Sequence, residues 1–62
     1  MKTYKRKDGY TYFLQQDKDG QHLIACPTNS DGSMDKENSL YVDDFAYPLT
    51  HGQTEYIIRQ LA

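Results

Sequence analysis

Hydrophobic and polar positions alternate along residues 3–26, and the same tripeptide interrupts the alternation twice. Lys-Asp-Gly occurs at Lys7-Asp8-Gly9 and again, eleven residues later, at Lys18-Asp19-Gly20. A three-residue hairpin loop needs two residues near the right-handed helical region and then one with positive φ, which glycine adopts without a Cβ penalty. The two turns therefore predict a three-stranded antiparallel meander.

The positions of the two turns also assign side chains to the two faces of the sheet. With three-residue loops, the first turn pairs Tyr4 with Tyr12 and the second pairs Asp17 with Gln21. Because side chains alternate with period two, one face should carry the core residues Tyr4, Tyr10, Tyr12, Leu14, His22, Ile24 and Cys26. The other face should be mostly polar, with a small apolar patch of Phe13, Leu23 and Ala25.

After the meander, the sequence predicts a loop and a short strand. Pro27 cannot donate to a strand ladder and should end the third strand. Residues 28–39 are rich in Ser, Asn, Asp and Gly, which predicts a flexible acidic loop. Leu40-Tyr41-Val42 predicts a short fourth strand, closed by Asp43-Asp44.

The C-terminal segment predicts a helix. Thr50 and Gln53 match a capping box, so the helix should begin after Thr50 and run to about Leu61. A helix of this length is marginal alone, so its apolar stripe should lie on the sheet. The predicted fold class is α+β: a three- to four-stranded antiparallel meander with one C-terminal helix packed on one face, in a single small domain spanning residues 1–62.

Composition narrows the class of protein. A chain of 62 residues, 37% of them hydrophobic, has few aliphatic core residues, and its six tyrosines must fill the deficit. Such a core buries little apolar surface. Docking on another protein, or formation of a homodimer, would bury more of it and stabilise the fold. The single cysteine, Cys26, cannot form an internal disulfide, which favours a reducing compartment. With no apolar run after the basic N-terminus, we expect neither a signal peptide nor a membrane span, and a cytoplasmic protein.

No motif in the sequence has the spacing of a catalytic or metal site. The Asp-Gly turns lack the ligand offsets of a calcium loop. His22 and Cys26 lie roughly 13 Å apart along one strand, too far for proton transfer. The adjacent Asp43 and Asp44 should point to opposite faces. One cysteine and two histidines do not make a structural zinc site. We therefore expect a protein that is not an enzyme and uses no cofactor or metal.

Single-stranded nucleic acid is one candidate partner. Cations and aromatic rings interleave near the N-terminus, and a sheet that combines them can hold a strand by charge and stacking. The candidate residues are Lys5, Arg6, Lys7 and Tyr10. The net charge of −2 and the need for these tyrosines in the core make this the second choice.

Another protein is the first choice of partner, because an apolar patch, an excess of tyrosine and a small domain are typical of binding modules. The candidate contact residues are Phe13, Leu23, Tyr41, Asp43 and Asp44. If the helix covers the Phe13 face instead, the contact surface becomes Tyr4, Tyr10 and Tyr12. In size the chain resembles the small regulators and inhibitors made by bacteria and phages, which makes inhibition of a larger protein one form of this hypothesis. A structural homodimer is the remaining alternative.

Overall fold

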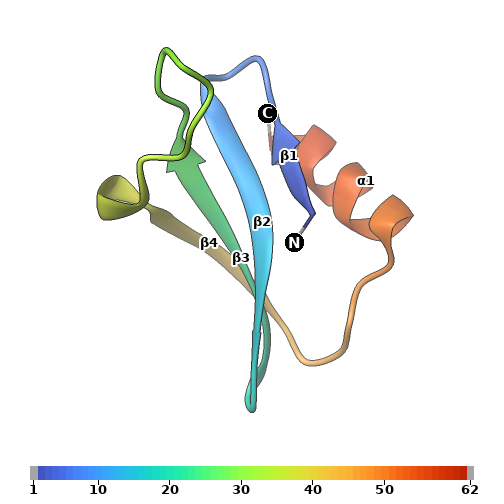
Figure 1. Ribbon diagram of the computed structural model, residues 1–62. Helices are drawn as coiled ribbons and strands as arrows, with labels where there is room; N and C mark the ends of the chain where they lie inside the picture. The colour runs from blue at the N-terminus through green and yellow to red at the C-terminus, as the bar shows by residue number, and fades with distance from the viewer. Residues whose placement is uncertain (1, 62) are drawn as a thin grey trace.

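The computed structural model describes residues 2–61, which form a four-stranded antiparallel sheet followed by one helix (Figure 1). The strands lie in chain order across the sheet, and a single 3-10 turn, η1, precedes the fourth strand. The elements are β1 (Thr3–Lys5), β2 (Tyr10–Asp17), β3 (Gly20–Pro27), η1 (Lys36–Asn38), β4 (Leu40–Phe45) and α1 (His51–Leu61). The predicted α+β class is confirmed.

The turn between β1 and β2 has the predicted geometry. Gly9 has a φ of 89°, and the Arg6 amide donates to the Tyr10 carbonyl at 2.9 Å across the three-residue loop. Tyr4 consequently pairs with Tyr12, as expected.

The turn between β2 and β3 is one residue tighter than predicted. Gly20 has the expected positive φ, 127°, but it pairs directly with Asp17, so the loop contains only Lys18 and Asp19. The Asp17 carboxylate accepts a hydrogen bond from the Asp19 amide at 2.8 Å, which stabilises this tight turn.

The tighter turn shifts the β2–β3 register by one residue and exchanges the faces of β3. Leu14 pairs with Leu23, and Tyr12 pairs with Ala25. A one-residue slip moves every side chain of a strand to the opposite face. The predicted facial assignment of β3 is therefore wrong. Leu23 and Ala25 share the face of Tyr4, Tyr10, Tyr12 and Leu14, which we call the inner face. His22, Ile24 and Cys26 share the opposite, outer face with Phe13.

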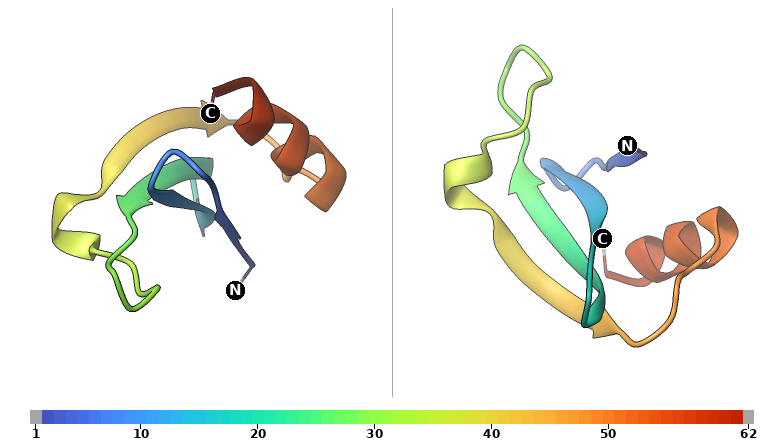
Figure 2. Two further views of the ribbon diagram at one scale, coloured as in Figure 1. Left: turned by 90° about the horizontal axis from the view of Figure 1, so that it is seen from above. Right: turned by 60° about the horizontal axis from the view of Figure 1, so that its bottom comes forward.

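Helix α1 covers the inner face, as the left view of Figure 2 shows. Leu23 and Ile58 are fully buried where the two layers meet, and Tyr12 is only 5% exposed. The predicted capping box is present: the Thr50 hydroxyl accepts from the Gln53 amide at 3.1 Å, and the Gln53 side chain accepts from the Thr50 amide at 3.0 Å. The buried apolar stripe of the helix is narrower than expected, because Leu61 remains 52% exposed.

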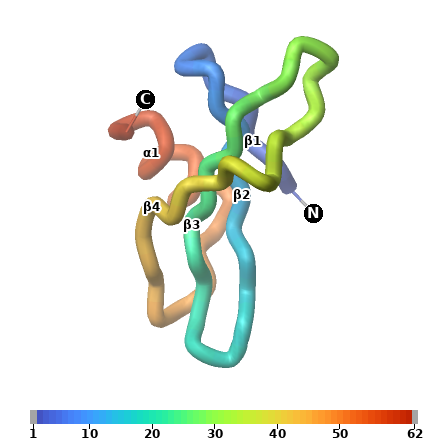
Figure 3. Tube along the Cα trace, turned by 90° about the vertical axis from the view of Figure 1, so that its left-hand side faces the viewer, coloured from blue at the N-terminus to red at the C-terminus, as the bar shows by residue number. Residues whose placement is uncertain are grey.

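The segment after β3 lies on the other side of the sheet from the helix (Figure 3). Pro27 ends β3 as predicted, and the Thr28 amide donates to the Gly9 carbonyl at 2.8 Å. The Thr28 hydroxyl lies 2.6 Å from the Thr11 hydroxyl, and Thr11 and Cys26 are buried although they belong to the outer face. These contacts give the segment a defined path; its flexibility stays a prediction.

Strand β4 is longer than predicted. It continues through the two aspartates to Phe45, and a bulge shifts its pairing with β3 between Leu23 and Ile24. The bulge lets Val42 and Phe45 both pack against the core. Helix α1 has 11 residues, and within residues 2–61 no helix has the length and apolarity to cross a bilayer.

Candidate functional site

The part of the outer face that the 28–39 segment leaves uncovered carries a row of large side chains. Phe13 pairs with Ile24 and Ile24 pairs with Tyr41, so the three residues occupy adjacent positions on β2, β3 and β4. Phe13 and Ile24 are partly exposed, and Tyr41 is 61% exposed. We call Phe13, Ile24 and Tyr41 the outer-face row.

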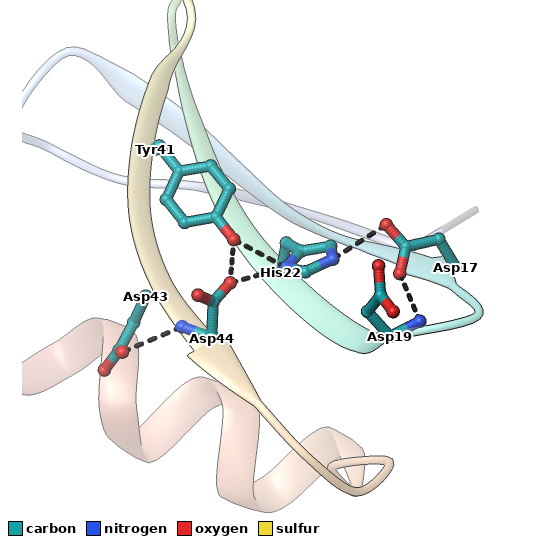
Figure 4. A network of polar contacts seen from close by, with 6 residues as sticks. All are labelled: Asp17, Asp19, His22, Tyr41, Asp43 and Asp44. Carbon is teal, nitrogen blue, oxygen red and sulfur yellow. Dashed lines mark hydrogen bonds and ion pairs between the residues drawn. The ribbon is translucent and has the colours of Figure 1, made fainter.

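A hydrogen-bonded network, drawn in Figure 4, borders one side of the outer-face row. His22 lies between two carboxylates: its Nε2 is 2.8 Å from Asp17 Oδ2, and its Nδ1 is 2.5 Å from Asp44 Oδ1. The Tyr41 hydroxyl donates to Asp44 and lies 2.6 Å from His22 Nδ1. Strands β2, β3 and β4 thus each contribute to the network, which fixes the end of the Tyr41 side chain.

The network favours the doubly protonated form of His22. The hydrogen bond to Asp44 raises the pKa of His22, and the bond to Asp17 raises it further. The pKa of Asp17 is lowered, mainly by the hydrogen bond from the Asp19 amide and also by His22. An imidazolium donates from both ring nitrogens, which is what two flanking carboxylates require.

Both ring nitrogens of His22 are already engaged by carboxylates. With a carboxylate at each ring nitrogen, His22 presents no free lone pair to a proton, a substrate or a metal ion. Within residues 2–61, no three histidine, cysteine or acidic side chains are grouped as a metal site requires. Cys26 is fully buried, and burial raises the pKa of its thiol, so the less reactive neutral form predominates.

The predicted contact residues separate in the structure. Phe13, Tyr41 and Asp44 lie on the outer face. Leu23 is 0% exposed in the core beneath the helix, so its prediction as a contact residue is wrong; the register slip is the reason. Asp43 pairs with Leu23 and is exposed on β4, and its carboxylate accepts from the Asp44 amide at 2.8 Å.

Two outer-face residues, Ile24 and His22, were not among the predicted contacts. A signal for them is present in the sequence. Asp at the first and Gly at the fourth position of a turn favour type I, and Asp17 and Gly20 have this spacing. Closing the second hairpin on that pair places Ile24 opposite Phe13 and His22 on the same face of the sheet.

Among the candidate nucleic-acid residues, Tyr10 lies apart from the three cations. Lys5 pairs with Thr11 on the outer face, whereas Tyr10 packs against the core on the inner face. Arg6 is half-buried and Lys7 is exposed at the turn between them. The alternative contact surface of Tyr4, Tyr10 and Tyr12 lies on the face that the helix covers.

A hydrogen bond between the first turn and the core stabilises the buried Tyr12. The Tyr12 hydroxyl donates to Asp8 Oδ2 at 2.6 Å. Burial of Tyr12, together with this bond to the carboxylate, raises its pKa to about 12. The Asp8 side chain therefore supplies the partner that a buried tyrosine hydroxyl requires.

An apolar hollow of about 340 Å³ lies between the helix and the segment that precedes it. Phe45, Leu49 and Ile57 form part of its lining, with Tyr47 and Tyr56 at its sides. Tyr56 is 63% exposed, nearly the same as Tyr41. It provides a matched comparison for Tyr41 on the opposite layer of the molecule.

Comparison of this chain with models of known protein families, with curated proteins and with solved structures finds no match.

Proposed function

We propose that this chain is a small, non-enzymatic protein-binding module whose partner contacts the outer face of the sheet. The outer-face row is the observation that carries the proposal. Phe13, Ile24 and Tyr41 lie next to one another on the face that the helix leaves uncovered. Aromatic side chains are enriched at the centres of protein interfaces, where they bury a large area with few rotatable bonds.

Tyr41 is held in place before any partner arrives. Its hydroxyl bonds to Asp44 and lies 2.6 Å from His22 Nδ1, and its ring lies 5.6 Å from the His22 ring. A side chain that is already ordered loses less conformational entropy on binding. Tyr41 is therefore the residue we expect to contribute most to affinity.

The edges of the sheet are less suited to a partner than its outer face. At the β4 edge, the Asp43 carboxylate already occupies the Asp44 amide, and the bulge distorts the strand. Charged side chains and bulges at an edge oppose strand addition. At the other edge, β1 is only 3 residues long. The partner should thus lie against the face, with side chains rather than main chain making the contact.

The charges beside the outer-face row define the chemistry of the partner. Asp17 and Asp44 flank a single histidine, so this side of the row carries a net negative charge whether His22 is neutral or protonated. Their side chains are 44% and 62% exposed and remain available to solvent. A partner with an apolar centre and a lysine or arginine beside it would complement this surface.

The experiment is capture of a partner by the immobilised chain from an extract of its source cells, with Tyr41→Ala compared with Tyr56→Ala. The two tyrosines are 61% and 63% exposed, so the substitutions remove similar exposed surfaces from opposite layers. Loss of a central aromatic contact costs about 2 kcal/mol or more, roughly a thirtyfold loss of affinity. A protein retained by wild type and by Tyr56→Ala but lost with Tyr41→Ala supports the proposal.

Equal retention by both variants would contradict it. Light scattering of the purified chain tests the homodimer alternative. A doubled mass that Tyr41→Ala halves and Tyr56→Ala leaves unchanged would identify a second copy of this chain as the occupant of the outer face.

A further inference from the structure

Three cations gather at the β1–β2 turn, and none of them forms a close ion pair within residues 2–61. Lys5, Arg6 and Lys7 are consecutive, and in residues 2–61 every ion pair within 4.0 Å involves a histidine rather than a lysine or arginine. Asp8 belongs to the same turn, but Tyr10 N and the Tyr12 hydroxyl occupy its two carboxylate oxygens. Lys5 acts electrostatically on Asp31 at longer range, whereas the charges of Arg6 and Lys7 are not used in an ion pair within the described residues.

Arg6 has an unmet hydrogen-bonding requirement. Its Nε is buried and has no acceptor within the described part of the chain. A buried donor on a charged group is unfavourable unless it is paired. A bound anion that engages the guanidinium would supply an acceptor after a side-chain shift that exposes Nε.

The turn also offers room for a ligand. Lys5, Arg6, Lys7 and Asp8 line a hollow of about 380 Å³. Across residues 2–61, the backbone amides of Lys7 and Asp8 have no hydrogen-bond acceptor, which leaves them free to donate. Lys5 is less available, because its Nζ reaches toward the neighbouring loop, where an added Cβ at Gly32 would lie 3.0 Å from it.

We propose that the β1–β2 turn binds a phosphate group. Arg6 and Lys7 would supply the positive charge, and the amides of Lys7 and Asp8 would donate to the phosphate oxygens. Arginine and turn amides together suit a tetrahedral oxyanion, because each donates in a fixed direction. The phosphate has two sources that share this chemistry: the free ion, or the backbone of a single-stranded nucleic acid. The site is separate from the outer-face row and does not depend on the proposed function.

The chain contains its own control for this proposal. The second Lys-Asp-Gly turn has the same three residues, but Gln16 and Asp17 precede it where Lys5 and Arg6 precede the first. The two turns lie at opposite ends of the sheet (Figure 1). Lys7→Gln and Lys18→Gln are thus the same substitution in the same tripeptide, and only the first alters the proposed site.

The test is titration of the folded chain with inorganic phosphate at constant ionic strength, balanced with chloride and followed by the amide NMR signals. We expect saturating shifts at Lys7 and Asp8 and none at Lys18 and Asp19. Lys7→Gln should weaken binding about threefold, the usual size for an exposed charge pair. Lys18→Gln should leave it unchanged. Arg6→Gln should weaken it about tenfold, because it removes charge-assisted hydrogen bonds.

Three outcomes would overturn the proposal. The chemical shifts could rise without saturating, they could be equal at the two turns, or Lys7→Gln and Lys18→Gln could change them equally. If Arg6→Gln unfolds the chain, the comparison of the two lysine variants decides the question. A short deoxythymidine oligonucleotide distinguishes the sources. Tighter binding than phosphate at the same amides, with a steep dependence on salt, assigns the site to a nucleic-acid backbone. Saturation by phosphate alone assigns it to the free ion.

Discussion

The two Lys-Asp-Gly turns should tolerate the same glycine-to-alanine substitution to different extents. Gly9 and Gly20 both have positive φ, 89° and 127°, so alanine is strained at either position. Their surroundings differ: a Cβ at Gly9 would meet nothing within 4 Å, whereas a Cβ at Gly20 would clash with the Phe45 carbonyl oxygen. Gly20→Ala should therefore destabilise the fold much more than Gly9→Ala.

The size of each effect can be derived from these surroundings. At Gly9, left-handed strain of about 1–2 kcal/mol is offset by a gain of about 0.4–1 kcal/mol from the less flexible unfolded chain, which leaves a loss of about 1 kcal/mol. At Gly20, the backbone must also shift to accommodate the added Cβ, which costs about 1–3 kcal/mol more. The total destabilisation is then about 3 kcal/mol. A domain of this size has a total stability of about 3–9 kcal/mol, so Gly20→Ala removes a large share of it.

Thermal unfolding followed by circular dichroism measures both variants. Each kcal/mol shifts the midpoint by about 4–8 °C in a small domain, so Gly9→Ala should lower it by about 4–8 °C and Gly20→Ala by about 12 °C or more. Equal shifts would refute the reasoning, because they would mean that β4 does not pass close to the second turn.

Three further predictions follow from single contacts. Thr50→Ala removes the helix cap and should cost about 1 kcal/mol in urea unfolding; an unchanged midpoint would argue against this helix start. Tyr12→Phe removes the bond to Asp8 and should cost about 1–2 kcal/mol. Because folding raises the pKa of Tyr12 from 10.0 to about 12, wild-type stability should also fall between those pH values relative to Tyr12→Phe. The pKa of His22 is raised as well, mainly by Asp44, so its stabilising effect is complete below about pH 6.5 and is lost as the pH rises through the raised value. The difference in thermal midpoint between wild type and His22→Gln should decrease across that range, and a constant difference would contradict the network.

The parts of the fold that follow from local chemistry were predictable from the sequence. The capping box of Thr50 and Gln53, the stop at Pro27 and the first turn each depend on residues within about five positions of one another. Such signals act through main-chain hydrogen bonds and sterics that the residues themselves supply. The α+β class follows from them.

The register of the second hairpin was not predictable from the tripeptide alone. Arg6 precedes the first Lys-Asp-Gly, whereas Asp17 precedes the second and accepts a hydrogen bond from the Asp19 amide. That bond favours a turn closed on Asp17 and Gly20 rather than on Asp17 and Gln21. One residue outside the repeated motif thus exchanged the core and surface sides of β3.

Prediction of the candidate site also depended on the β2–β3 register. Phe13 lies on the predicted face because the register of β1 with β2 was predicted correctly, whereas Leu23 and His22 on β3 were assigned to the wrong faces. The network of His22 with Asp17 and Asp44 joins three strands, and contacts between strands appear only when the pairing is known. Sequence spacing along one strand could not reveal it.

The composition of the outer face is itself an argument for a binding role. Apolar area contributes about 25 cal/mol per Å² when it is removed from water, and Leu23 and Ile58 obtain this fully in the core. This stabilisation is only partly realised by the outer-face row, Phe13, Ile24 and Tyr41, because these side chains remain partly or largely exposed. Only 37% of the chain is hydrophobic, so a larger core would stabilise this small domain. The remaining exposed area of the outer-face row becomes stabilising only when another surface covers it. The polar network that fixes Tyr41 adds order to a side chain that the core does not need, which is the arrangement we expect of a preformed contact surface.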